Sequence, residues 1–332
     1  MASTTMIPLR RPRPRDLAAI GIPWLIAYGT LQTYWRLGHR PAELSPVGDD
    51  LVFLNGWGVV GLCGAAVPLL AALAVSRPSR AVRRLLLLAS WATAITLVSA
   101  AAMVLLDVVG GILPGLGIEF FPLGALSRAG CLGGGVIVGM AALSYQRATR
   151  AGCAACGRAG PSEAPERPGR TPVWAFAAAY GAVAGCAVRI GAQAVVGFDE
   201  SPLASGVSVL LFELGFLLGG TLLPLSLVHS WGRVWPRWVP GLAGRRVPRR
   251  LVLWPAAGIS AGLVVYFGLM LLQMIAERLQ GRNPFPPSGG LDLPEAFFWF
   301  AVPSYLAWGA GMAVAAFGYH RLTRRACGEC GR

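Results

Sequence analysis

Residues 51–75 read LVFLNGWGVVGLCGAAVPLLAALAV and contain no charged side chain. A helix of this length rises about 37 Å, whereas the hydrocarbon core of a bilayer is about 30 Å thick. The segment therefore predicts a membrane-spanning helix. Seven other stretches are comparably long and apolar, so that the predicted spans are 17–37, 51–75, 84–108, 120–146, 173–196, 204–229, 251–276 and 295–320.

The composition leads to the same class. Of 332 residues, 55% are hydrophobic and only 13% are charged, whereas soluble domains carry about a quarter of charged residues. This composition excludes an ordinary soluble domain, and it is the opposite of what a disordered chain needs. The sequence predicts an all-α membrane protein with eight transmembrane helices.

The basic residues predict the orientation in the membrane. All 29 are arginine, the net charge is +14, and 23 of the 29 fall on one face. That face comprises the N-terminus, the 76–84, 147–172 and 230–250 loops and the C-terminus. The positive-inside rule then predicts a multi-pass protein of the cytoplasmic membrane with both termini cytoplasmic. Because the arginines lie in short loops between apolar segments, we expect no nucleic-acid partner.

An internal duplication divides the chain. Residues 145–158 read YQRATRAGCAACGR and residues 319–332 read YHRLTRRACGECGR, and eight of the fourteen positions are identical. The sequence thus predicts two four-helix repeats, 1–158 and 173–332, joined by a linker over 159–172. Because an even number of helices gives both repeats the same orientation, we expect parallel repeats related by a pseudo-two-fold axis along the membrane normal.

Two short patterns resemble a known group of proteins. Tyr34-Trp35 followed by Leu37-Gly38 at the end of an apolar helix, and the arginine-rich Cys-x-x-Cys-Gly-Arg tails, resemble motifs of uncharacterised multi-pass membrane proteins from actinobacteria. In the second repeat, Ala187-Val188 replaces the Tyr-Trp pair. The resemblance implies a membrane location and a repeated unit, and it brings no reaction.

The most specific candidate site is formed by the two tails. Four thiolates on one membrane face fit a tetrahedral metal site, for which zinc is the best candidate. The neighbouring arginines also favour thiolates, which leaves a redox pair as an alternative. A third possibility is that the tails have no chemical role, because chain ends fray. The four cysteines are Cys153, Cys156, Cys327 and Cys330.

Two charges fall inside predicted spans. Arg128 lies about eight residues into the fourth span and Glu213 about nine residues into the sixth, and both spans start on the outer side. A lone charge at such a depth costs at least about 2.5 kcal/mol on insertion scales, which favours pairing of the two residues. The pair is either a structural salt bridge or part of a ligand or transport site.

Further ion pairs are expected at the outer interface. Arg36 and Arg189 stand at equivalent places near the outer ends of the first and fifth spans, and acidic pairs follow each of them. The pattern predicts ion pairs that fix each helical hairpin, with an outward-facing anion or metal site as the alternative. The acidic residues are Asp49, Asp50, Asp199 and Glu200.

A tryptophan- and arginine-rich segment follows the sixth span. Such a segment between two spans is typical of contact with the membrane surface and its anionic headgroups. The predicted lipid-contacting residues are Trp231, Arg233, Trp235, Arg237 and Trp238.

The sequence favours a non-enzymatic function. We expect small-molecule or lipid binding or permeation between the repeats, with a cytoplasmic four-cysteine clamp. One alternative is a thiol-redox or metal-dependent enzyme at the cytoplasmic face, and another is a structural partner of other membrane proteins. No serine-nucleophile, phosphate-loop or paired-carboxylate motif is present in the sequence.

Overall fold

The computed structural model describes residues 12–41, 44, 56–75, 79–116, 118–149, 153, 170–197, 207–285 and 293–324. Within these ranges the regular structure is helical, with one isolated β-bridge between Val234 and Arg246 and no strand. The helices are α1 (Pro14–Tyr34), η1 (Trp35–His39), α2 (Trp57–Val75), α3 (Arg80–Ala100), α4 (Val104–Ile112), α5 (Pro122–Ala148), α6 (Val173–Val196), α7 (Val207–Leu217), η3 (Leu218–Leu222), α8 (Leu223–Val228), η4 (Ser230–Gly232), α9 (Arg249–Leu279) and α10 (Glu295–Thr323).

Seven helical segments are long and apolar enough to cross a membrane. They are α2, α3, α5, α6, the continuous run of α7, η3 and α8, α9 and α10. The prediction of an all-helical chain with several helices that could cross a membrane is therefore confirmed for the described residues. The first predicted span corresponds to α1, which has 21 residues but carries Arg15 and Asp16 and does not belong to the seven.

The helices pack into two bundles with separate cores. One core is formed by buried side chains of α1, α2, α3 and α5. The other is formed by α6, α8, α9 and α10. Large apolar side chains are exposed over many of these helices, and α7 has no buried residue at all. Such an apolar surface suits lipid rather than water.

Small residues bring the helices of each bundle close together. A methyl group added at Gly185 of α6 would lie 2.7 Å from the carbonyl oxygen of Ser304 in α10, and one at Gly311 would lie 2.5 Å from that of Ala178. In the first bundle, Gly21 of α1 faces Leu70 and Ile137 in the same way. Close backbone approach at small residues is the usual way in which helices associate in lipid.

The third predicted span differs from the structure. A single helix was expected over residues 84–108, whereas α3 ends at Ala100 and the short helix α4 begins at Val104. The break redirects the chain so that Asp107 on α4 is buried and faces α5. Pairing of this carboxylate offsets the cost of burying it.

The sixth predicted span is interrupted by a π-helical turn. This turn, η3, directly precedes Pro224, which lies at the start of α8. Proline has no N–H for the carbonyl four residues earlier, here that of Gly220, and a wider turn accommodates the missing bond. The second bundle therefore contains a local irregularity at Leu218–Leu222.

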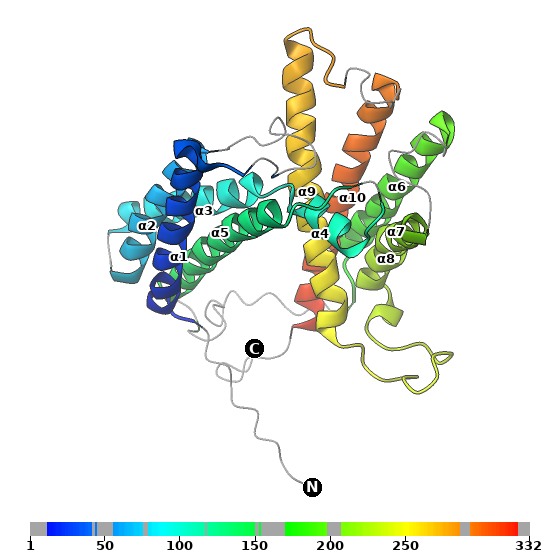
Figure 1. The fold of residues 1–332 in the computed structure, drawn as a ribbon. Coiled ribbons are helices and arrows are strands. Elements are labelled where there is room, and N and C mark those ends of the chain that lie inside the picture. The colour runs from blue at the N-terminus through cyan, green and yellow to red at the C-terminus, as the bar shows by residue number, and fades with distance from the viewer. Residues whose placement is uncertain are drawn as a thin grey trace.

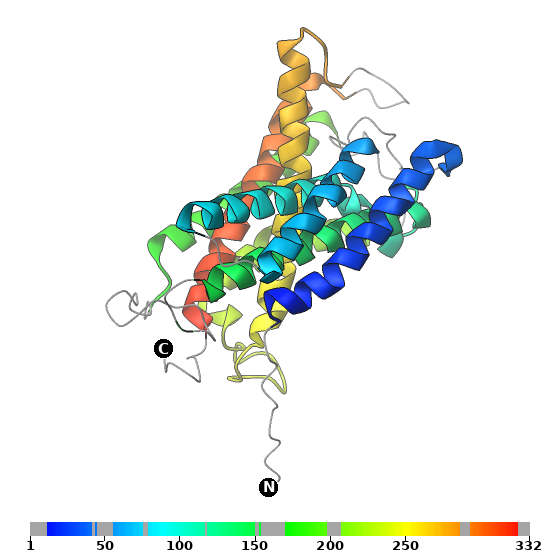
Figure 2. The same cartoon turned by 90° about the vertical axis from the view of Figure 1, so that its left-hand side faces the viewer.

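The two bundles lie side by side (Figure 1). The starts of α1 and α9 and the end of α10 lie on the same side of the molecule in both views (Figures 1 and 2). In Figure 2, α9 stands upright whereas α1 and α2 cross the view obliquely. Helices α1 and α2 are thus inclined to α9 in this view. A two-fold axis that related the two bundles would therefore not be parallel to α9.

Candidate functional site

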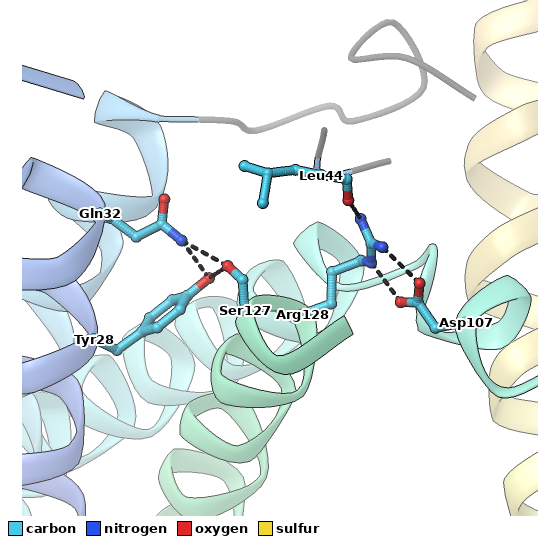
Figure 3. A network of polar contacts seen from close by, with 6 residues as sticks. All are labelled: Tyr28, Gln32, Leu44, Asp107, Ser127 and Arg128. Carbon is cyan, nitrogen blue, oxygen red and sulfur yellow. Dashed lines mark hydrogen bonds and ion pairs between the residues drawn. The ribbon is translucent and has the colours of Figure 1, made fainter. Parts of the chain in front are cut away.

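Among the described residues, Arg128 has hydrogen-bond partners at all three nitrogens of its guanidinium group. It lies six residues after Pro122, the first residue of α5. Its Nε donates to Asp107 Oδ2 at 2.5 Å, its Nη2 donates to Asp107 Oδ1 at 2.5 Å, and its Nη1 donates to the Leu44 carbonyl at 2.9 Å (Figure 3). The two side chains are only 12% and 5% exposed. This bidentate geometry leaves no net charge at the site.

A second polar cluster lies beside this pair and connects α1 with α5. Gln32 Nε2 donates to Tyr28 Oη at 2.9 Å and to Ser127 Oγ at 2.8 Å. The Tyr28 and Ser127 hydroxyls are 3.3 Å apart (Figure 3). All three side chains thus find partners within the bundle, which is typical of structural hydrogen bonds between membrane helices.

The partner of Arg128 differs from the one expected from the sequence. Its ion pair is with Asp107 of α4, whereas Glu213 lies on α7 with an exposed side chain. Residues 84–108 were expected to form one helix, and Glu213 rather than Asp107 was expected to pair with Arg128. The break after Ala100 moves Asp107 to the start of α5. The only sequence signal for this contact was an acidic residue at the end of an apolar run.

Arg189 is a cation within a helix of the second bundle, and its surroundings differ from those of Arg128. Its Nε donates to Tyr305 Oη at 3.1 Å, and its Nη2 donates to Gln193 Oε1 at 3.0 Å. Its guanidinium carbon lies 5.0 Å from the centre of the Phe297 ring and 5.4 Å from that of Tyr305. Among the described residues, no carboxylate lies within ion-pair distance of Arg189.

Aromatic rings surround the residues that hold Arg189. Phe267 of α9 stacks on Tyr305 with ring centres 4.0 Å apart, and Phe216 of α7 meets Tyr305 edge-on at 5.9 Å. Phe216 also meets Trp308, at 4.9 Å. The Nε1 of Trp308 is buried and has no hydrogen-bond partner. Helices α6, α7, α9 and α10 therefore all contribute to one polar-aromatic cluster.

The ion pairs predicted at the outer interface are described only in part. Asp49, Asp50, Asp199 and Glu200 lie outside the described residues. Arg36 is exposed, and its guanidinium lies against Gly56 just before α2. Arg189, in contrast, is turned into its bundle and bound by Tyr305 and Gln193. The two arginines stand at equivalent places in sequence but in different environments.

The proposed four-cysteine clamp also lies mostly outside the described residues. Cys156, Cys327 and Cys330 belong to the undescribed part, and Cys153 alone is described, half-buried. Within the described ranges there is no group of three or more potential metal ligands. The other described cysteines, Cys63, Cys131 and Cys186, are buried between helices, as expected of small apolar residues.

The tryptophan- and arginine-rich segment forms an ordered hairpin between α8 and α9. Trp235 N donates to the Arg245 carbonyl at 2.9 Å, and Val247 N donates to the Arg233 carbonyl at 2.9 Å. Trp231, Trp235, Arg237 and Trp238 all lie on this segment, and Trp238 is 81% exposed. The hairpin thus presents aromatic and basic side chains at the end of two helices.

Comparison with known proteins identifies no relative: no protein-family model, no curated protein and no solved structure matches the chain. The functional argument therefore depends on the residues of this chain alone.

Proposed function

We propose that the chain is a protein of the cytoplasmic membrane with eight spans and with both termini on the cytoplasmic side. Helix α1 is the eighth span, because its side chains share a core with α2, α3 and α5. The arginine distribution supports this orientation. So does the common side on which α1 and α9 begin and α10 ends (Figure 1).

We also propose that the two bundles are tandem repeats. In the first bundle α5 packs against α1 and α3, and in the second α10 packs against α6 and α9. These pairs correspond in the order of predicted spans within each repeat. The duplicated Tyr-x-Arg-x-Thr-Arg sequence follows at the ends of α5 and α10.

For the biochemical role, we infer binding of an anionic small molecule or lipid at Arg189. One observation carries this proposal: Arg189 lies within a predicted membrane helix, and it has no carboxylate partner among the described residues. Arg189 lies seven residues before Val196, the last residue of α6. It is therefore about 10 Å from the helix end, within reach of a ligand that enters from the outer side.

The energetics favour an external anion. A charge inside a membrane helix costs about 2.5–3.5 kcal/mol on insertion scales. Contact with an aromatic ring returns about 0.5–2 kcal/mol, depending on desolvation. Hydroxyl and amide oxygens complete the shell without neutralising the charge. A carboxylate or phosphate group that reached Arg189 would supply the missing charge and form stronger hydrogen bonds.

The seam between the bundles is a less suitable place for a ligand. Leu105 of α4 packs against the second core, and a methyl group added at Gly262 of α9 would lie 3.2 Å from its Cδ1. Ser208 Oγ donates to the Pro114 carbonyl at 2.7 Å across the same seam. Permeation between the bundles would have to displace these contacts. We therefore locate the binding site within the second bundle.

An enzymatic role at the cytoplasmic face would depend on the four tail cysteines. Three of them lie outside the described residues, and Cys153 alone offers no metal or redox geometry. A purely structural role would leave Arg189 without a counter-charge from the described residues. Binding of an anion at Arg189 is the interpretation that gives this cation a counter-charge.

The test compares the wild type with Arg189→Gln in nanodiscs of phosphatidylcholine, a lipid without net charge. The probes are decanoate, dodecyl phosphate and, as a neutral control of matched chain, decanol. At 100 times its dissociation constant, a bound probe stabilises the folded state by about 2.7 kcal/mol. We expect at least one anionic probe to raise the unfolding temperature of the wild type but not of Arg189→Gln.

Arg36→Gln is the matched control, because Arg36 stands at the equivalent place of the first bundle and is exposed. It should keep the full response to the probe. If Arg189→Gln does not fold, Arg189→Lys retains the charge and should retain a weaker response. Equal stabilisation of wild type and Arg189→Gln, a response to decanol as large as that to decanoate, or no response to any anion would overturn the proposal.

A further inference from the structure

The basic end of the second bundle is organised by the hairpin between α8 and α9. Gly244 N donates to the Trp235 carbonyl at 3.0 Å, which closes the hairpin. Tyr319 Oη of α10 donates to the Gly232 carbonyl at 3.0 Å, which fastens the start of the hairpin to the end of α10. Tyr319 is buried. Arg233, the next residue along the chain from Gly232, is thus placed near the end of α10.

Several cations converge on Tyr319 and its neighbour His320. Arg249, the first residue of α9, has its Nη2 2.5 Å from His320 Nδ1 and 3.4 Å from the His320 carbonyl. Arg233 is adjacent in the chain to Gly232, which binds Tyr319, and Arg324 follows about one helical turn after His320. The Nε of Arg249 is buried and has no hydrogen-bond partner.

At the opposite end of the same bundle, arginines are paired with carboxylates. There, Arg282 Nε lies 2.5 Å from Glu277 Oε2, and Arg278 Nη1 lies 3.5 Å from Glu295 Oε2. At the basic end, no carboxylate of the described residues pairs with Arg233 or Arg249. Clustered like charges repel one another, so that an anion from outside would stabilise this arrangement.

We propose that Arg233, Arg249 and the hairpin form a binding site for the phosphate group of an anionic lipid. Arginine suits phosphate because its planar fork donates two parallel hydrogen bonds. The positive end of the helix dipole of α9, a helix of 31 residues, adds to the attraction. The occupant is a lipid headgroup rather than a soluble phosphate, because apolar surface accompanies the charges.

The tryptophans supply that apolar surface. Trp238 is 81% exposed on the hairpin, and Trp254, in the second turn of α9, is 72% exposed. Tryptophan is enriched where a membrane meets water, because its ring is apolar and its N–H is polar. Helix α8 ends at Val228 and α9 begins at Arg249, so the hairpin lies where two spans reach the membrane surface.

The experiment uses the full chain in two kinds of nanodisc, pure phosphatidylcholine and a 7:3 mixture of phosphatidylcholine and phosphatidylglycerol. Lipids retained by the protein are counted by native mass spectrometry, and unfolding temperature is measured in parallel. We expect phosphatidylglycerol to be retained and to raise the unfolding temperature of the wild type. In Arg233→Gln/Arg249→Gln, affinity for phosphatidylglycerol should fall about fivefold for each arginine removed.

Arg278→Gln is the matched control, since it removes one arginine from the other end of α9. It should leave retention of phosphatidylglycerol unchanged. Arg189→Gln reports on the outer site proposed above, so that lipid lost only in this variant is assigned to that site. If the double glutamine variant does not fold, Arg233→Lys/Arg249→Lys keeps the charges, and it should keep most of the retention.

Three results would overturn the proposal. The first is equal retention of the two lipids by the wild type, and the second is retention by Arg233→Gln/Arg249→Gln that equals the wild type. The third is a rise in unfolding temperature with inorganic phosphate in pure phosphatidylcholine that equals the rise with phosphatidylglycerol. In that case the ligand would be a soluble ion rather than a lipid headgroup. Loss of retention in Arg189→Gln alone would assign the lipid to the outer site instead.

Discussion

The two bundles contain the same kind of charge in different surroundings. Arg128 of the first bundle and Arg189 of the second both lie about two turns from the end of their helix. Arg128 is paired with Asp107 and is almost fully covered. Arg189 is held by a hydroxyl, an amide oxygen and aromatic rings. The first bundle inserts a short helix, α4, that carries the carboxylate of Asp107, and the described part of the second bundle offers no such carboxylate to Arg189.

This contrast separates a structural charge from an available one. A buried ion pair is costly to break, because removing one partner leaves an uncompensated charge. Arg189 is already removed from water and held by neutral acceptors, so an incoming anion would bind to a preorganised site. We therefore expect substitution of Arg128 to alter stability and substitution of Arg189 to alter binding.

The largest effect is expected for Asp107→Asn. The substitution keeps the shape of the side chain but leaves Arg128 without a counter-charge, which should lower the free energy of unfolding by about 3–5 kcal/mol. Denaturation in neutral nanodiscs measures the change. As a control, Glu213→Gln on the exposed face of α7 should not lower it, because Glu213 does not pair with Arg128 and a lone charge in a membrane span is itself costly. Similar effects for the two substitutions would contradict the assignment of Asp107 as the partner.

A smaller effect is expected for Tyr305→Phe. The substitution keeps the ring that stacks on Phe267 and removes the hydroxyl that accepts a hydrogen bond from Arg189. Loss of a hydrogen bond to a charged group should cost about 1.5–3 kcal/mol. The same unfolding measurement applies, and Tyr266→Phe is a control because it changes a neighbouring tyrosine of α9. No loss of stability would show that the hydroxyl does not hold Arg189.

Ser127→Ala tests the polar cluster beside Arg128. It removes the hydroxyl that binds Gln32 and Tyr28, and such contacts between membrane helices average about 0.6 kcal/mol, with a maximum of about 1.7 kcal/mol. The expected loss of stability is therefore well below that of Asp107→Asn. A loss as large as that of Asp107→Asn would mean that the ion pair and this cluster act as one unit.

The smallest effect on the bundles is expected for Cys153→Ser/Cys330→Ser. If the four tail cysteines bind zinc, the wild type should contain about one zinc ion per chain and the double variant none, as measured by elemental analysis. The free energy of unfolding of the bundles should change by less than about 0.5 kcal/mol, since Cys153 belongs to neither described core. Retention of zinc in the double variant, or its absence from the wild type, would exclude the clamp.

Much of the helical architecture could be predicted from hydropathy. The apolar runs give the position of every long helix, because a membrane selects length and apolarity. The helix breaks were harder to predict. The turn between α3 and α4 depends on a tertiary contact, the one between Asp107 and Arg128. The π-helical turn η3 has a local signal in Pro224, which was visible in the sequence but not interpreted.

The sequence indicated Arg189 only as a member of an ion pair at the outer interface. Its environment combines Gln193, Phe297, Tyr305 and Phe267, which come from three helices. Except for Gln193, one turn further along α6, no spacing in the sequence brings them together. The sequence suggested the following acidic residues as partners because they are close in the chain, whereas packing turned the side chain toward α10.

The most direct test makes the same substitution in both bundles, Arg128→Met and Arg189→Met. Unfolding temperatures are measured in phosphatidylcholine nanodiscs with and without dodecyl phosphate. The account predicts that Arg128→Met is strongly destabilised yet still stabilised by the probe, and that Arg189→Met is close to the wild type in stability but does not respond. The opposite pattern, or the same pattern for both variants, would contradict the division between a structural and an available cation.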